Sequence, residues 1–263
     1  MSNYGFIGCG NMGGALIRAA VKSVEPSNVW ITDKDTAKCA AMAKETGAQP
    51  KEILELASRC QYIFIGVKPQ GLAAMLSEIQ GTLAERKDHF VLVSMVAGTS
   101  IERLVSMVGD YPFVRIMPNI PASVGDGMIL YCSHKADNAD VQGFLSAMEK
   151  AGRLTEIEEK LIDAGSAVSG CGPAYAFMFI EALADGGVEC GLPRAQAQLL
   201  AAQTLLGAAK MVMETGKHPG ELKDAVCSPG GTTIEGVLAL ERGGFRSAAA
   251  EAVIAAYEKT LGL

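Results

Sequence analysis

Two glycine-rich loops contain the residues of this chain that are best suited to hold a charged ligand. The first is Gly8-Cys9-Gly10-Asn11-Met12-Gly13, directly after the apolar residues 4–7. The second is Ser228-Pro229-Gly230-Gly231-Thr232-Thr233, far along the chain. A glycine loop that opens a helix offers backbone amides and the positive end of the helix dipole to an anion. Two such loops, in segments of different composition, predict separate sites for a phosphate-bearing cofactor and a small anionic substrate. This arrangement is typical of a two-domain dehydrogenase or reductase.

The first loop matches the dinucleotide-binding pattern G-x-G-x-x-G. Gly8 permits the tight turn out of the strand, Gly10 lets the backbone approach a pyrophosphate, and Gly13 lets the helix pack close to the sheet. The pattern alone is weak evidence, but here it lies between a strand and a helix, and Asp33 follows at the end of the next strand. A glycine turn without a ligand is the alternative. The predicted cofactor contacts of this loop are Gly8, Gly10, Asn11, Met12 and Gly13.

Asp33 leaves the choice of cofactor open. A carboxylate at this position accepts hydrogen bonds from the ribose hydroxyls of NAD(H) and repels the additional phosphate of NADP(H). However, Lys34 follows immediately and Lys38 lies one helical turn further on, and either charge offsets that repulsion. Alternatively, Asp33 only caps the helix that we expect over residues 36–47. We include Asp33 and Lys34 among the predicted cofactor-binding residues.

Three later loops leave predicted strands on the side of the sheet where a nicotinamide would lie. Ligands of parallel α/β sheets collect at the carboxyl ends of the strands. Lys68 is the only charged side chain in the first two of these loops, which makes it a candidate catalytic residue, although a surface lysine at a helix start fits equally well. The predicted cofactor contacts of these loops are Val67, Lys68, Pro69, Ala97, Gly98 and Asn119.

The second glycine loop is suited to a carboxylate. The pattern Thr232-x-x-Glu235 is typical of a capping box and predicts a helix from about Thr233. Before it, Pro229-Gly230-Gly231 can turn successive N–H groups inward and form a nest for an anion. With the helix dipole and the Thr233 hydroxyl, such a nest holds a carboxylate without an arginine. A purely structural helix cap is the alternative.

The first part of the chain alternates strand-like and helix-like segments, which predicts parallel pairing with right-handed crossovers and helices on both faces of the sheet. We expect strands over residues 4–9, 28–33, 62–67, 90–96 and 112–116, with edge strands over 126–132 and 154–157. The helices expected between them cover residues 12–23, 36–47, 70–78 and 140–150. The predicted fold class is therefore α/β, with an N-terminal Rossmann-type, doubly wound, mostly parallel sheet over residues 1–157.

After residue 157 no convincing strand signal remains, and residues 158–263 are predicted to form an all-α domain for substrate binding and dimerisation. The expected helices cover residues 158–168, 173–190, 193–214, 220–227, 233–242 and 245–261. The segment is dense in alanine and glycine, so each helix buries little bulk. We expect apolar residues such as Phe177 and Phe179 to complete their core against a second subunit. A compact bundle packed on its own first domain is the alternative.

Composition limits the partners and the compartment. The net charge of −6 and the absence of a Lys/Arg cluster argue against nucleic acid. The seven cysteines and three histidines are scattered, so we expect neither a disulfide framework nor a metal site, and reduced thiols in a cytosol fit better. No secretory signal is evident, and the longest apolar stretch, near residues 174–184, contains Glu181 and is shorter than the roughly 20 residues of a membrane span. We therefore expect a soluble, cytoplasmic protein without a membrane partner.

Four segments of the helical part carry a close resemblance to a known family. They are residues 169–175 (SGCGPAY), 181–187 (EALADGG), 214–224 (ETGKHPGELKD) and 228–233 (SPGGTT). Together with residues 7–13 (IGCGNMG) and 67–69 (VKP), they resemble Δ1-pyrroline-5-carboxylate reductase over nearly the whole chain. The resemblance implies reduction of the ring C=N bond of pyrroline-5-carboxylate by NAD(P)H to give L-proline, the last step of proline biosynthesis. It also implies dimers interlocked through the helical domain, often assembled further into rings.

The resemblance further implies roles for the second glycine loop. Gly231, Thr232 and Thr233 would hold the substrate carboxylate, with the catalytic Thr233 hydroxyl near the ring nitrogen. Val226 and Ser228 would line the same pocket. NADP(H) is the favoured cofactor and NAD(H) remains possible, because Asp33 stands where members that prefer NADPH commonly carry small polar or basic residues.

Two other functions remain to be weighed. A β-hydroxyacid dehydrogenase also joins a dinucleotide-binding domain to a helical one, but it carries a catalytic lysine on the interdomain helix. No lysine stands between Leu161 and Cys190. A non-catalytic NAD(P)-binding sensor is the second rival, and the intact Gly-Gly-Thr-Thr site argues against it.

Overall fold

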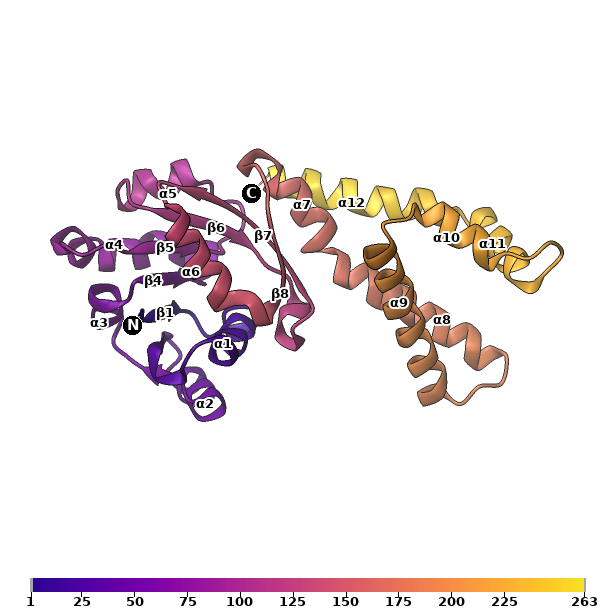
Figure 1. The fold of residues 1–263 in the computed structure, drawn as a ribbon, viewed down its shortest axis with the longest axis horizontal. Helices are drawn as coiled ribbons and strands as arrows, with labels where there is room; N and C mark the ends of the chain where they lie inside the picture. Colours follow the sequence, from indigo (N-terminus) through magenta and orange to yellow (C-terminus); the bar gives the residue numbers. More distant parts are fainter. Residues whose placement is uncertain (1, 263) are drawn as a thin grey trace. The chain divides into compact units, whose positions relative to one another are not determined.

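The computed structural model describes residues 2–262, and within them a single twisted sheet of eight strands forms the centre of the N-terminal part (Figure 1). The strand order is β3-β2-β1-β4-β5-β6-β7-β8. The strands are β1 (Tyr4–Ile7), β2 (Val29–Thr32), β3 (Gln49–Pro50), β4 (Tyr62–Ile65), β5 (Val91–Ser94), β6 (Phe113–Met117), β7 (Gly127–His134) and β8 (Gly152–Glu156).

Every neighbouring pair of strands is parallel except β6 and β7. The parallel strands β1, β2, β4, β5 and β6 therefore end at one edge of the sheet, and the loops after them meet there. Because β7 runs the other way, it begins at this same edge. The predicted fold class is confirmed.

Helices cover both faces of the sheet, since strands that are buried on both faces need two apolar layers. In the first core cluster, α1, α2 and α6 pack on one face, and in the second α3, α4 and α5 pack on the other. The helices of this part are α1 (Asn11–Ser23), α2 (Thr36–Thr46), α3 (Ile53–Arg59), α4 (Pro69–Glu85), α5 (Ile101–Val108), α6 (Asn138–Met148) and α7 (Ile162–Ser169). Short 3-10 turns are η1 (Pro26–Asn28), η2 (Ile120–Val124), η3 (Glu149–Ala151) and η4 (Glu159–Leu161).

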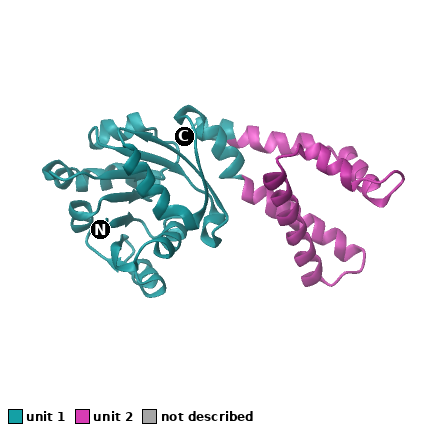
Figure 2. Cartoon of the chain, viewed as in Figure 1, with its two compact units in different colours: residues 1–171, 257–263 teal, residues 172–256 magenta. Residues whose placement is uncertain are grey.

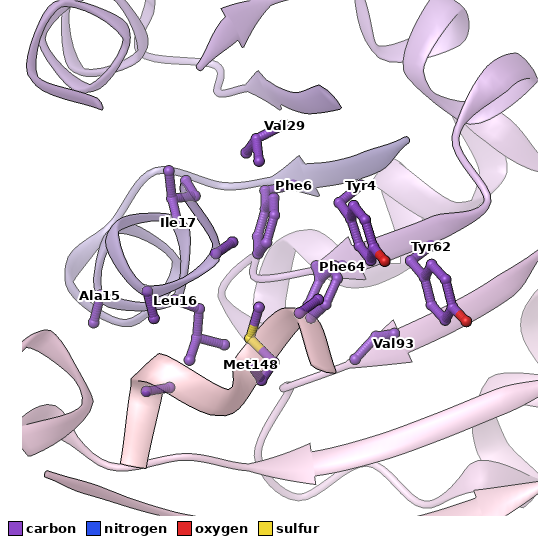
Figure 3. Packing of buried hydrophobic residues seen from close by; sticks show 14 of the residues in the cluster. Tyr4, Phe6, Ala15, Leu16, Ile17, Val29, Tyr62, Phe64, Val93 and Met148 are labelled. Carbon is purple, nitrogen blue, oxygen red and sulfur yellow. The ribbon is translucent and has the colours of Figure 1, made fainter. Parts of the chain in front are cut away.

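Stacked aromatic rings hold the centre of the sheet in register (Figure 3). The ring of Phe6 on β1 lies 4.3 Å from that of Phe64 on β4, and Tyr4 and Tyr62 stack at 5.0 Å one row further along. Figure 3 shows Leu16 and Ile17 of α1 packed on this face. This packing holds α1, which follows the first glycine loop, against the sheet.

Three short elements were not predicted from the sequence. They are the two-residue strand β3 and the helices α3 and α5, of seven and eight residues. β3 is too short to show any periodicity, whereas the apolar spacing of Ile101, Leu104 and Val108 in α5 is a helical pattern that the prediction did not recognise. The absence of α3 from the prediction matters, because its first residues border the cofactor cleft described below.

The chain divides into two compact units (Figure 2), residues 1–171 with 257–263 and residues 172–256. Residues 158–171 fall in the first unit because α7 is fastened to the sheet. Ile162 is buried in the second core cluster, and the guanidinium of Arg115 pairs with Glu159 and Asp163 at 3.1 Å each. A functional boundary at residue 157 remains a prediction, because a division into compact units does not test where substrate binding begins.

The second unit is helical throughout. It contains α8 (Gly172–Glu189), α9 (Arg194–Thr215), α10 (Pro219–Val226), α11 (Thr232–Arg242) and most of α12 (Phe245–Leu261). Its only cluster of buried residues, among those the structure describes, consists of three alanines where α8 meets α9. Large apolar side chains such as Met178, Leu199 and Met213 are more than 60% exposed. A unit that buries so little and exposes so many large apolar side chains is typical of an interaction surface.

The helical run Glu159–Glu189 is also long and apolar enough, by length and composition alone, to cross a membrane. One such helix is weak evidence, and the exposed apolar surface of the second unit extends well beyond this run. The prediction that the protein has no membrane partner is not tested by these observations.

Candidate active site

A cleft of about 480 Å³ opens in the first unit at the carboxyl ends of β1, β2 and β4. Six of the predicted cofactor residues line it: Gly8, Gly10, Asp33, Lys34, Val67 and Lys68. The sequence therefore located this cleft on three separate loops that the parallel sheet brings together.

The glycines of the first loop differ in what they require. A Cβ on Gly8 would lie 2.6 Å from the carbonyl oxygen of Gly66, and one on Gly13 would lie 2.1 Å from that of Gly8. Gly8 also has φ +116°, a conformation that other residues rarely adopt. These two glycines are required by the fold itself.

Gly10 is different, because no contact within the protein requires a glycine at this position. It precedes α1 with ordinary extended backbone angles, and a Cβ there would meet no atom within 4 Å. The open space above Gly10, at the N-terminus of a 13-residue helix, fits the close approach of a pyrophosphate. The residues present therefore fit a dinucleotide.

The other predicted cofactor residues lie near this edge of the sheet but not on the cleft. Asn11, Met12 and Gly13 form the first turn of α1, and Pro69 begins α4 directly after the exposed Lys68. Ala97 and Gly98 follow β5, where Gly98 has φ +67°. Their contact with a cofactor stays a prediction.

Asn119 has a structural task. Its side-chain carbonyl accepts a hydrogen bond from the Met128 amide at 2.9 Å, and its side-chain NH₂ donates to the carbonyl of Ser169 at 2.9 Å. Asn119 is 7% exposed. It thus ties the end of β6 to the start of β7 and to the end of α7, and these bonds are sufficient to explain an asparagine there.

The Asp33 carboxylate is bound to the protein's own backbone. One oxygen accepts from the Cys9 amide at 2.6 Å, and the other accepts from the Asp35 amide at 2.8 Å. Asp35, not Asp33, is the residue that caps α2, through its bond from the Lys38 amide. The interpretation of Asp33 as the helix cap is therefore wrong, and its carboxylate instead joins the loop after β2 to the glycine loop after β1.

Cys9 lies within the glycine loop but is not a nucleophile. Burial raises the pKa of its thiol to about 12. The thiol is therefore protonated at neutral pH, and a protonated thiol is a poor nucleophile.

Several residues of the cleft were not predicted. Glu52 and Ile53 at the start of α3 line it, and so do Met75 and Glu78 of α4. The apolar spacing of Ile53, Leu56 and Ala57 is the sequence signal for α3, and seven residues are too few to make that signal clear.

The second glycine loop begins α11 in the second unit, and its cap differs from the prediction. The helix starts at Thr232 with Gly231 as the capping residue, and no side chain caps it. The predicted capping box of Thr232 and Glu235 is wrong, because Thr232 already lies inside the helix and Glu235 is one position too far along. Gly230 has φ +68°, and the Gly231 amide donates to the carbonyl of Ser228 at 3.0 Å, which closes the turn.

This turn leaves amides free at the helix start. No described residue accepts a hydrogen bond from the amides of Thr232 or Thr233. The Thr233 side chain, like those of Val226 and Ser228, is exposed, and neither threonine hydroxyl is engaged in the cap. The free amides of Thr232 and Thr233 suit an anion, whereas the Gly231 amide of the predicted nest is already bonded to Ser228. The role of this loop in binding substrate stays a prediction.

No group of three or more His, Cys, Asp or Glu side chains suited to a metal ion occurs within residues 2–262. The absence of a metal site stays a prediction from the sequence. Every cysteine of the chain is free of a disulfide.

The comparisons with known proteins agree with one another over the whole chain. The family model for pyrroline-5-carboxylate reductase dimerisation matches residues 159–263, and the model for NADP oxidoreductase, coenzyme F420-dependent, matches residues 3–98. Pyrroline-5-carboxylate reductase from Escherichia coli is 45% identical over 97% of this chain and 96% of its own length. The chain belongs to the pyrroline-5-carboxylate reductase family.

Solved structures of this family match the chain over nearly its whole length. The pyrroline carboxylate reductase of Plasmodium falciparum, with NADP bound, has a TM-score of 0.86 at 34% identity and covers 98% of this chain and 97% of its own. The pyrroline-5-carboxylate reductase of Coxiella burnetii has a TM-score of 0.90 at 29% identity, with 99% and 98% covered. The family resemblance drawn from the four segments of the helical part, with residues 7–13 and 67–69, is confirmed. As a member of this family, the protein is an NAD(P)-dependent oxidoreductase, and the β-hydroxyacid dehydrogenase reading is set aside.

Proposed function

We propose that the protein reduces Δ1-pyrroline-5-carboxylate to L-proline with NADPH, the last step of proline biosynthesis. The observation that supports this most strongly is the second glycine loop. In a chain of this family, it places free amides and a threonine hydroxyl at a helix N-terminus, where they suit a small carboxylate. A non-catalytic sensor of NAD(P) would have no use for this loop.

The first unit would hold the dinucleotide. The amides that open α1 above Gly10 would bind the pyrophosphate, and Lys34 and Lys38 stand at the side of the cleft where the adenosine ribose is bound in such folds. NADPH, when bound, supplies a hydride from C4 of its nicotinamide. The NADP named in the Plasmodium structure and in the family model for residues 3–98 supports NADPH as the donor.

The second unit would hold the imine. The amides of Thr232 and Thr233 would bind the substrate carboxylate, and the hydroxyl oxygen of Thr233 would accept a hydrogen bond from the protonated ring nitrogen. Gly231, Ser228 and Val226 complete this pocket. A cyclic iminium is already a good hydride acceptor, so the residues need to align it and exclude water rather than to supply a strong acid.

A turnover assay tests the proposal. We expect NADPH to be oxidised only when pyrroline-5-carboxylate is present, with proline formed in a one-to-one ratio, as measured by chromatography. No proline with either NADPH or NADH, in protein shown to bind the cofactor, would contradict the proposal and favour the sensor.

We also propose that the protein self-associates through its second unit, as a dimer or a larger ring, in the cytoplasm. The matching dimerisation family and the exposed apolar side chains of α8 and α9 support self-association. The cytoplasm is supported by seven cysteines without a disulfide and by relatives named for a biosynthetic reductase.

The native mass in solution should therefore be at least twice the 27.5 kDa of one chain. A charged Met178→Glu side chain, at a position 69% exposed in the single chain, should reduce the mass measured by sedimentation. Val124→Glu is the matched control, since Val124 is 73% exposed but lies in the first unit, and it should leave the mass unchanged. A wild-type protein that sediments as a monomer at micromolar concentration would refute self-association.

A further inference from the structure

The side chain that the dinucleotide pattern assigns to the ribose is engaged elsewhere in this protein. Both oxygens of Asp33 accept backbone N–H groups, from Cys9 at 2.6 Å and from Asp35 at 2.8 Å. The Cys9 amide belongs to the loop whose shape decides whether a pyrophosphate can approach Gly10. The carboxylate therefore joins the loop after β2 to the glycine loop after β1 by hydrogen bonds.

These bonds also change what Asp33 offers a cofactor. Each oxygen already accepts one amide N–H, and the partial positive charges of these two N–H groups offset part of the field of the carboxylate, so Asp33 has fewer lone pairs free for the ribose hydroxyls than a carboxylate without such bonds. Glu52 lines the same cleft, and its carboxylate adds a second negative charge that disfavours a phosphate there. A cation is therefore needed if NADPH is to bind well.

Two lysines stand next to Asp33 on the cleft, and they are not equivalent. The Lys38 ammonium lies 3.3 Å from the Asp35 carboxylate, which offsets part of its charge. Lys34 is exposed, lines the cleft, and forms no ion pair with any residue from 2 to 262. Lys34 thus carries the free positive charge nearest to Asp33 in sequence.

We infer that Asp33 is a positioning residue that shapes the glycine loop for NADPH and NADH alike, and that Lys34 sets the preference for NADPH. This inference rests on the proposed use of a dinucleotide but not on imine reduction. It departs from the common reading of an acidic residue at this position, which is a ribose contact that selects NADH.

Direct binding of the two reduced cofactors, without imine, tests both parts. An Asp33→Asn side chain keeps one acceptor oxygen but turns an NH₂ group toward the other amide. It should raise the Kd of NADPH and the Kd of NADH by about tenfold each, the scale of one lost hydrogen bond to a charged group. The ratio of the two Kd values should change by less than about threefold. If the variant bound NADH alone more weakly, or bound NADPH more tightly, Asp33 would be a ribose contact. That result would overturn its proposed role as a positioning residue.

Lys34→Ala should raise the Kd of NADPH by about tenfold or more and that of NADH by less than about twofold, because only NADPH carries the additional phosphate. The matched control is Lys44→Ala, which removes an exposed lysine from the last turn of α2 and should change neither Kd. An equal loss of affinity for both cofactors, or no loss for either, would overturn the proposed role of Lys34 in the preference for NADPH.

If the melting temperature of Asp33→Asn shows that the variant does not fold, an NMR measurement on the wild type tests the role of Asp33 instead. The Cys9 amide proton, bonded to a carboxylate, should resonate far downfield in a ¹⁵N-edited spectrum and remain there when NADH or NADPH binds. Loss of that downfield position on binding NADH would show the carboxylate turning to the ribose, against the inference. Because substrate is absent from all these experiments, a failure of the proposed imine reduction would leave their outcome unaffected.

Discussion

A Thr233→Ala variant is expected to lose about 10- to 100-fold in kcat/KM for pyrroline-5-carboxylate, the scale of one lost charge-assisted hydrogen bond. The variant keeps the free amides of the second glycine loop but lacks the hydroxyl proposed to contact the ring nitrogen. Affinity for NADPH should be nearly unchanged, since the cofactor cleft is lined by residues of the first unit.

The fold should tolerate this change. Gly231 caps α11 through its backbone, and no threonine hydroxyl takes part in that cap. The melting temperature should therefore stay within a few degrees of the wild type. Thr204→Ala is the control, because Thr204 is also exposed on a helix of the second unit and its hydroxyl only donates to the Leu200 carbonyl. Full activity in a stable Thr233→Ala enzyme would remove Thr233 from the site.

Replacing Gly10 with alanine should separate cofactor binding from folding. A Cβ at Gly10 meets no atom of the protein within 4 Å, so the free energy of unfolding should hardly change. The same methyl group would occupy the space where a pyrophosphate approaches the loop. We expect the Kd of NADPH to rise by about 10- to 100-fold, the scale of one or two lost hydrogen bonds to a charged group.

Two alanine variants bracket this result. Gly13→Ala would bring a Cβ to 2.1 Å from the Gly8 carbonyl oxygen and should lower the melting temperature. Gly81→Ala, at an exposed and open position inside α4, should leave cofactor binding unchanged. If Gly10→Ala bound NADPH as tightly as the wild type, the pyrophosphate would not lie over this loop.

The sequence predicted the parts of the fold in which unbroken apolar runs alternate with longer helical patterns. Buried strands such as Tyr62–Ile65 and the crossovers between them leave a signal in composition and in spacing, and they bring the loops of Gly8, Asp33 and Val67 to one edge. β3 has two residues and α3 has seven, and neither was recognised, because two residues show no period and seven show barely two turns. Glu52, which borders the cleft, was missed for that reason.

Hydrogen-bond partners were less predictable than positions. The sequence placed Asp33 at the correct edge but not its bond to Cys9, because that bond depends on how two loops approach each other. Asn119 was grouped with the nicotinamide loops, and its bonds to Met128 and Ser169 appear only once β7 is seen to begin beside β6. The capping box at Thr232 failed by a single residue, since a glycine can cap a helix with its backbone alone.

The fate of the transferred hydride tests the proposed reaction most directly. With NADPH that carries deuterium at the transferable C4 position, we expect proline with one deuterium at Cδ, the carbon of the former C=N bond, as measured by mass spectrometry and NMR. Proline without deuterium at Cδ, or oxidation of NADPH without labelled proline, would contradict it.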